Sequence, residues 1–341
     1  MRLLLLSAMA IFAGAIVAAQ PAKLIADESI ISASNPATLS AFGFFGGTPD
    51  RPAGALIPYQ LNTPLFSDYA DKQRFIYLPA GTKISAAADG RLNFPVGAAL
   101  IKSFGYPAGD GKLQVIETRL LLHRAEGWVA LPYVWRKDGS DADLRVGGTR
   151  LAVSFTKPDG AHMDISYAVP NKNQCKQCHV SGDQVVPIGP IWQNMRFMLD
   201  ADRRRILQDN PALAKLPAEA IWNDTKSGTL EQRAHVYLRV NCGHCHAPKG
   251  SASNSGLFLD GSAKDLSAYG IGKRPVAAGR ASGDMDFIVE SGKPARSILI
   301  NRMKSVDPGI AMPELGRAAS HDEGVKLLEE WIASMPPSAA H

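Results

Sequence analysis

Residues 229–246 read TLEQRAHVYLRVNCGHCH, a stretch that joins a helix signal to a cysteine motif. Thr229 is followed three residues later by Gln232, which is the pattern of a capping box at a helix start. Apolar side chains then recur on one side of a helix as far as the C-x-x-C-H motif at 242–246. The stretch therefore predicts a helix that leads directly into two cysteines and a histidine.

The same motif occurs once more, at 175–179, and the two copies contain every cysteine of the chain. C-x-x-C-H is the attachment signature of c-type haem, in which two thiols one turn apart bind one porphyrin and the adjacent histidine ligates the iron. Three alternatives are weighed. A four-cysteine zinc site would not need a histidine directly after each pair. A thioredoxin-like redox pair would follow a strand in a βαβ unit, which neither motif does, and structural disulfides inside C-x-x-C are strained and uncommon. We therefore expect two covalently bound haem c groups as cofactors. The expected thioether ligands are Cys175, Cys178, Cys242 and Cys245, and the expected axial histidines are His179 and His246.

Two further features follow the second motif. Met312 stands directly before a proline, and the last predicted helix bears Trp331. Together with Pro248, these features make residues 225–336 resemble a class I cytochrome c domain. The resemblance implies that Met312 is the sixth ligand of the second iron and that Trp331 packs on the helix before the motif. It also implies that the region of Pro248 orients His246.

Two other methionines compete with Met312 for the second iron. Met303 lies in a predicted helix with an apolar face, where a role in the core is the expected one. Met285 stands in a glycine-rich loop with no pattern behind it. The last helix should begin with a second capping box, from Ser320 to Glu323.

The sixth ligand of the first iron is left open by the sequence. Ile191, Met195 and Met198 share one face of a predicted helix, so either methionine could reach the iron or both could belong to the core. His162 and Met163 precede the first motif, and an empty sixth position is a further alternative. We take Met195 as the candidate axial ligand.

The N-terminal half contains no cysteine and shows a different pattern. Short apolar runs alternate with turns rich in Gly, Pro and Asp, which is typical of antiparallel strands. Glu117 and Arg119 alternate with apolar neighbours in one run, either as a solvent-facing ion pair or as a pair beside the first haem, where the cation could balance a propionate. The expected strands lie at 74–78, 113–122, 128–135 and 163–169.

The predicted fold class is multidomain β + α. An N-terminal antiparallel β-sandwich or barrel-like domain is expected to precede a mainly α-helical, cytochrome c-like haem region. The expected division is a signal peptide at 1–19, an irregular lead-in at 20–60, a β domain at 61–170, a first haem-binding segment at 171–224 and the class I cytochrome c-like domain with the second haem at 225–336.

The N-terminus predicts export. Residues 1–19 have a positive start, an uncharged apolar run and small residues before Gln20, which is the pattern of a signal peptide cleaved near Ala19. Because no second long apolar run follows, no integral membrane segment is expected after cleavage, and the expected location is the periplasm. The formal charge of +5 is small for 341 residues and the basic residues are scattered, which argues against nucleic acid as a partner.

From about residue 55 to 336 the chain resembles a poorly characterised family of bacterial periplasmic dihaem c-type cytochromes. The resemblance implies a periplasmic redox protein and supplies no substrate. It is carried by residues 61–70, 93–97, 116–119, 133–135, 141–142, 170–171, 233–234, 237–238 and 241.

The expected function is electron transfer between periplasmic redox partner proteins, which the sequence does not identify. Methionine ligation of the second iron favours electron transfer, because the ligand set of a six-coordinate iron changes little between its oxidation states. The alternative is an enzyme: a peroxidase-like, haem-dependent oxidoreductase with an open sixth position on the first haem. We predict the carrier, since only the second motif lies in a cytochrome-like setting. No catalytic residue is predicted.

Overall fold

The computed structural model describes residues 27–109, 111–196, 205–262, 265–277 and 279–337. The expected signal peptide, its cleavage site near Ala19 and Met198 lie outside these residues. About 27% of the structure is strand and 23% is helix, with five α-helices in the described part. None of the helices in these ranges is long and apolar enough to cross a membrane.

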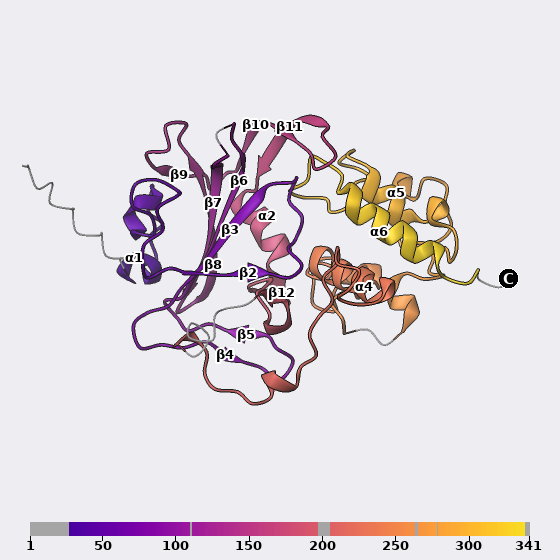
Figure 1. The fold of residues 1–341 in the computed structure, drawn as a ribbon, viewed down its shortest axis with the longest axis horizontal. Helices are drawn as coiled ribbons and strands as arrows, with labels where there is room; N and C mark the ends of the chain where they lie inside the picture. The colour runs from indigo at the N-terminus through magenta and orange to yellow at the C-terminus, as the bar shows by residue number, and fades with distance from the viewer. Residues whose placement is uncertain (1–26, 110, 197–204, 263–264, 278, 338–341) are drawn as a thin grey trace, which may run out of the picture.

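A six-stranded antiparallel sheet forms the centre of the N-terminal part (Figure 1). The strand order is β1-β3-β6-β7-β8-β9, so β1 and β9 are edges and the sheet stays open. The strands predicted from the sequence are confirmed in β3, β7, β8 and β11. The bounds are β1 Ile57–Pro58, β3 Asp71–Tyr77, β6 Ala99–Pro107, β7 Leu113–Arg124, β8 Gly127–Trp135, β9 Ala142–Leu144, and, for the separate hairpin, β10 Thr149–Thr156 and β11 His162–Val169.

Both faces of the sheet are covered, because neighbouring residues of a strand point to opposite sides. Ile101 and Leu120 enter the largest apolar cluster, beneath helix α1 and the 3-10 helix η1. Leu100 and Leu121 enter a second cluster on the other face, and Phe104 enters a third one with the hairpin. The bounds of the covering elements are α1 Asp27–Ile31 and η1 Leu39–Phe42.

Short elements lie outside the six-stranded sheet, and those after β11 lead to the C-terminal part. The helix predicted over 191–198 is wrong in its described residues, which form the 3-10 helix η2 and then strand β14. Asn194 explains the difference, because its side chain accepts from Thr63 N at 2.7 Å and donates to Thr63 O at 2.9 Å, which holds this stretch extended beside β2. The bounds are β2 Gln60–Leu61, β4 Ser85–Ala86, β5 Leu92–Asn93, α2 Lys172–Cys178, β12 Val180–Ser181, β13 Gln184–Val185, η2 Trp192–Asn194, β14 Met195–Arg196 and η3 Leu213–Lys215.

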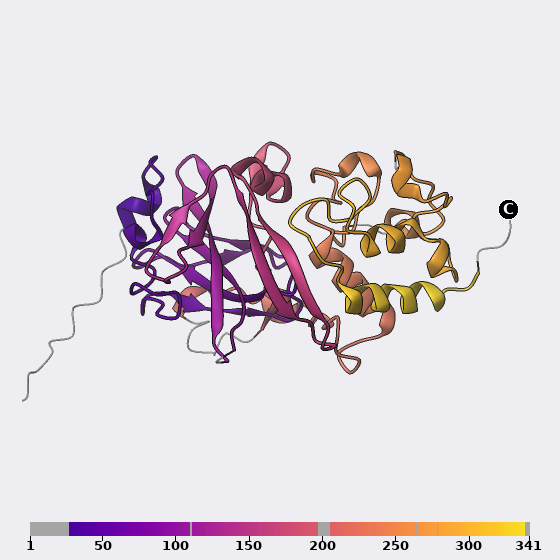
Figure 2. The ribbon, with the colours of Figure 1, turned by 90° about the horizontal axis from the view of Figure 1, so that it is seen from above.

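Three α-helices lie to one side of the sheet in both views (Figures 1 and 2). Thr229 and Gln232 form the predicted capping box at the start of α4. The second predicted capping box is wrong: α6 begins after His321, and Glu323 accepts a hydrogen bond from the distant Tyr69 instead. The bounds are α4 Leu230–Asn241, η4 Ser253–Ser255, η5 Leu266–Tyr269, η6 Gly279–Ser282, η7 Pro294–Arg296, α5 Ile298–Lys304 and α6 Asp322–Ala333.

Helices α4 and α6 pack closely together. Gly324 of α6 faces Tyr237 of α4, where a Cβ would lie only 2.2 Å from the tyrosine oxygen. Trp331 lies edge-on to His235 of α4, with 5.5 Å between the ring centroids. The expectation that Trp331 packs on the helix before the second motif is therefore confirmed.

The predicted fold class is wrong. Within 225–336, the described residues hold α-helices of only 12, 7 and 12 residues, and turns and single 3-10 turns fill most of the rest of the described part. A mainly α-helical region is therefore not seen there. Gly and Pro recur between α4 and α5 and favour turns over helix. In the N-terminal part, an open sheet with a hairpin beside it replaces the expected sandwich or barrel.

Candidate functional site

A single large cavity is lined by residues of both C-x-x-C-H motifs. Its volume is about 1320 Å³, which exceeds the roughly 300–1,000 Å³ of ordinary small-molecule pockets. Residues of the sheet, of α4 and of the loop before α6 complete the wall. The expected ligands that line it are Cys175, Cys178, His179, Cys242, Cys245, His246 and Met312.

The first motif lies on helix α2, which a capping box between Asn171 and Gln174 starts. The helix sets Cys175 and Cys178 one turn apart, and His179 follows as its C-cap. His179 Nδ1 lies 2.9 Å from the carbonyl oxygen of Val186. A carbonyl can only accept, so Nδ1 carries the proton and Nε2 keeps its lone pair. Burial lowers the pKa of His179 to about 4, which keeps the ring neutral near pH 7.

The second motif begins where α4 ends, and His246 N donates to Cys242 O at 2.9 Å. His246 Nδ1 lies 3.0 Å from Ser255 Oγ, and this hydroxyl donates its own proton to Ala252 O at 2.7 Å. Ser255 therefore accepts from Nδ1, and Nε2 of His246 also keeps its lone pair. The contact that orients His246 comes from Ser255, not from the expected region of Pro248.

Glycine is required inside the second motif. A Cβ on Gly243 would lie 2.6 Å from Arg239 O and 2.8 Å from Leu259 O, both of them backbone atoms. Lys176 holds the equivalent position of the first motif and is exposed. The chain after α4 is thus folded tightly against its own backbone, whereas the first motif has room for any side chain here.

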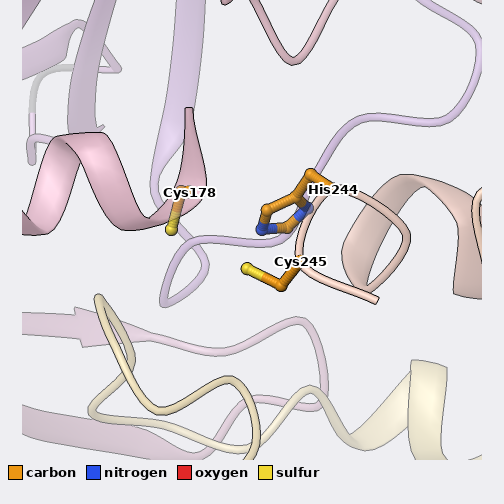
Figure 3. A group of neighbouring side chains, drawn as sticks. All are labelled: Cys178, His244 and Cys245. Atoms are coloured by element: carbon orange, nitrogen blue, oxygen red, sulfur yellow. The ribbon is translucent and has the colours of Figure 1, made fainter. Parts of the chain in front are cut away.

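The two motifs touch each other (Figure 3). One ligand atom from each of Cys178, His244 and Cys245 lies within 4.8 Å of the others, and Gly182 N donates to Lys249 O at 3.0 Å beside them. A hydrogen bond between the two thiols raises the pKa of Cys178 and lowers that of Cys245. His244 points at the first motif, although side chains inside such motifs normally point outward.

The loop that carries Met312 is anchored from both parts of the chain. Met312 is half-buried, its N–H donates to Arg302 O at 3.0 Å, and its carbonyl accepts from the Arg317 guanidinium. Asp68 Oδ1 accepts from Ala318 N at 2.8 Å and from Ala319 N at 2.9 Å. A residue of the N-terminal part therefore fixes the loop that presents the thioether.

Asp68 belongs to a connecting segment, residues 63–69, that joins the two parts of the chain. Phe66 N donates to Asn241 Oδ1 at 2.8 Å, directly before the second motif. Tyr69 donates to Glu323 of α6 at 2.9 Å. Sequence reasoning missed this role, because an extended loop carries no sign of what its polar groups will bind.

Among the described candidates for the sixth ligand of the first iron, Met195, Met163 and His162 do not line the cavity, and Met198 lies outside the described residues. Met195 packs in the apolar cluster around Leu100, and Met163 packs in the cluster around Phe104. His162 is exposed on β11. Met303 is buried among apolar side chains, as expected, although part of it also touches the cavity.

Glu117 is fully buried and Arg119 faces the cavity, so the interpretation as a solvent-facing surface pair is wrong. The Glu117 side chain is fully buried, and its two oxygens accept from Arg119 Nε at 2.7 Å and Nη2 at 2.9 Å. Tyr167 donates to the same carboxylate at 2.9 Å. Arg119 reaches the cavity wall.

Comparison with models of known protein families, with curated proteins and with solved structures found no match to this chain. The functional interpretation therefore depends on the two motifs and on the cavity that they share.

Proposed function

We propose that the chain is an exported dihaem c-type cytochrome that transfers electrons between redox partner proteins of the periplasm. The observation that carries this proposal is the shared cavity, into which both C-x-x-C-H motifs contribute all their cysteines and histidines. A four-cysteine zinc site is less compatible, because the cluster of ligand atoms in contact contains Cys178, His244 and Cys245 and leaves Cys175 and Cys242 out.

The residues present fit haem c. Four thiols stand in two pairs with the spacing of the attachment motif, and each motif histidine donates from Nδ1 and so offers Nε2 to a metal. Met312 supplies a thioether on the same wall, held by the Arg317 and Asp68 contacts. When bound, haem c supplies an iron that accepts and releases one electron.

The chain's own residues would keep such an iron in a constant environment. The hydrogen bonds from His179 and His246 to Val186 and Ser255 fix the ring orientations, which is the usual task of a second shell around a metal. Apolar lining such as Leu121 limits the entry of water. A rigid ligand set favours electron transfer, because little rearranges when the charge changes.

One observation favours the alternative function, an enzyme of the peroxidase type. Met195 packs in an apolar cluster and is not among the residues that line the cavity. The first iron would then lack the methionine expected for it, and polar side chains such as Arg119 would stand in the same cavity. The carrier stays our proposal, because the four donors expected for the second haem all line the cavity: Cys242, Cys245, His246 and Met312.

The experiment is an EPR spectrum of the fully oxidised, haem-loaded chain, with Met312→Ala and Met285→Ala as a matched pair. The carrier predicts two low-spin signals, of which one changes in Met312→Ala and neither changes in Met285→Ala. A high-spin signal that shifts on addition of cyanide or peroxide would reject the carrier and support the enzyme.

A further inference from the structure

Three cations stand in one row across the sheet, on the face that looks into the cavity. The strand register pairs Arg74 of β3 with Lys102 of β6, and Lys102 with Arg119 of β7. Residues paired in register lie on the same face at neighbouring positions, and like charges there repel each other. All three side chains line the cavity that holds both motifs.

The row is short of negative charge. Arg119 is paired with Glu117, whereas Lys102 has no hydrogen bond or ion pair to any described residue. Among the residues that the structure describes, the hydrogen bond of the Arg74 guanidinium is a 3.4 Å contact to the carbonyl oxygen of Lys72. Three positive charges therefore face one carboxylate in a wall of the protein where charges are normally paired.

The surroundings make a solvated surface patch a poor explanation. Arg74 is only 8% exposed. The Lys102 ammonium and the Arg119 guanidinium lie over the same Phe104 ring, at 5.0 Å and 4.3 Å from its centroid. Leu100 and its apolar cluster close the row on the other side. The cations lie between two apolar clusters and face the cavity.

The geometry points to a carboxylate-binding site on the sheet wall of the cavity, formed by Arg74, Lys102 and Arg119. A carboxylate suits the row, because a guanidinium and an ammonium can each donate to one of its oxygens. Burial lowers the pKa of Lys102 well below its usual value, and the neighbouring cations lower it further, so an anion here would also favour the charged ammonium.

Two sources could supply this carboxylate. One is a propionate of a haem held in the same cavity, and this form of the inference rests on the proposed function. The other is a small carboxylate that enters from solution, and this form does not need a haem. Lys102 and Arg119 line the same cavity as Cys175, Cys178 and His179 of the first motif, so a haem held there would have the row within its own cavity.

The test uses the purified, haem-loaded full chain, whose haem content is measured on the same preparation. The variants are Lys102→Met and Arg74→Gln, which remove different members of the row. Lys83→Met is the matched control, because Lys83 is exposed and does not line the cavity. Titration calorimetry with succinate measures binding from solution, and potentiometry measures the reduction potential of each iron.

Binding of succinate that both variants weaken by about tenfold or more would support the site with a ligand from solution. The site with a propionate would be supported by two results together. Succinate does not bind, and at a fixed potential the ferric-to-ferrous ratio rises about tenfold in both variants, which is a reduction potential lower by about 59 mV for one electron. The inference is overturned if succinate does not bind and both variants keep the wild-type potentials.

The proposed function can fail separately from this site. If the preparation contains no haem, the proposed function is rejected, and the succinate titration alone then tests the carboxylate-binding site. Thermal unfolding of each variant, compared with wild type, checks that the variant folds. If one variant does not fold, the other gives the same two readouts.

Discussion

Asp68→Ala should loosen the loop that carries Met312. The Asp68 carboxylate is 1% exposed and accepts from the N–H groups of Ala318 and Ala319. Hydrogen bonds to a charged group contribute about 1.5–3 kcal/mol each. Asp68 also has a φ of 48°, where aspartate is tolerated better than alanine, at a cost of roughly 1 kcal/mol.

Burial of the Asp68 carboxylate reduces the stabilisation that its hydrogen bonds provide. Asp68 Oδ2 is buried without a partner, and burial raises the pKa of this side chain. We therefore expect Asp68→Ala to lower the free energy of unfolding by about 2–4 kcal/mol, which is less than the sum of its contacts. The matched control is Asp68→Asn, which keeps an acceptor oxygen and tolerates the same φ, and should cost less than about 1 kcal/mol.

Thermal unfolding followed by circular dichroism measures the whole effect, and amide hydrogen exchange at Ala318 and Ala319 measures the local one. Exchange there should be about 30-fold faster or more in Asp68→Ala. Because the folded pKa of Asp68 is raised, its contribution to stability is present at low pH and is lost as the pH rises through that pKa. Asp68→Asn should therefore gain on wild type as the pH increases from about 4. Equal stability and equal exchange in the Ala and Asn variants would refute the reasoning.

Three further predictions concern other parts of the site. Gly243→Ala should disrupt the second motif and reduce haem attachment there, because its Cβ would meet backbone atoms. Lys176→Ala, at the equivalent exposed position of the first motif, should leave haem attachment unchanged. The measurement is the haem absorbance per chain. Burial lowers the pKa of His321 to about 4, below its unfolded value. The free energy of unfolding should therefore fall by about 3 kcal/mol as the pH drops from 6.5 toward 4. Urea unfolding at several pH values measures this dependence, which should be weaker in His321→Asn. Glu117→Gln leaves Arg119 without its carboxylate and should cost about 2–3 kcal/mol, less than a fully buried pair because the Arg119 side chain is 30% exposed. Tyr167→Phe removes the hydrogen bond to Glu117 and a longer one, at 3.3 Å, from Arg119, and should cost about 1 kcal/mol. A Glu117→Gln variant as stable as Tyr167→Phe would contradict this.

Local features of the structure could be predicted from the sequence. The capping box at Thr229 and the helix that follows depend on contacts within four residues, and the strands depend on alternation along a single run. The spacing of the cysteines sets their separation on α2 without any help from the rest of the chain.

The remaining features depend on contacts between distant residues. Phe66 meets Asn241 and Asp68 meets Ala318, pairs separated by 175 and 250 positions, and no pattern in either stretch indicates its partner. The same reason explains why the helix predicted around Met195 is wrong. Asn194 forms hydrogen bonds with the distant Thr63, and these hold the chain extended despite the helical spacing of its apolar residues. The helix content was overestimated, because a motif typical of cytochromes does not determine how much of the surrounding chain is helical.

Mass spectrometry of the denatured full chain, produced in cells that attach haem c, tests the central claim most directly. The account predicts a mass increase of two haem groups in wild type and of one in each double variant, Cys175→Ser with Cys178→Ser and Cys242→Ser with Cys245→Ser. A wild-type chain without added mass, or one that instead binds zinc through these cysteines, would contradict it.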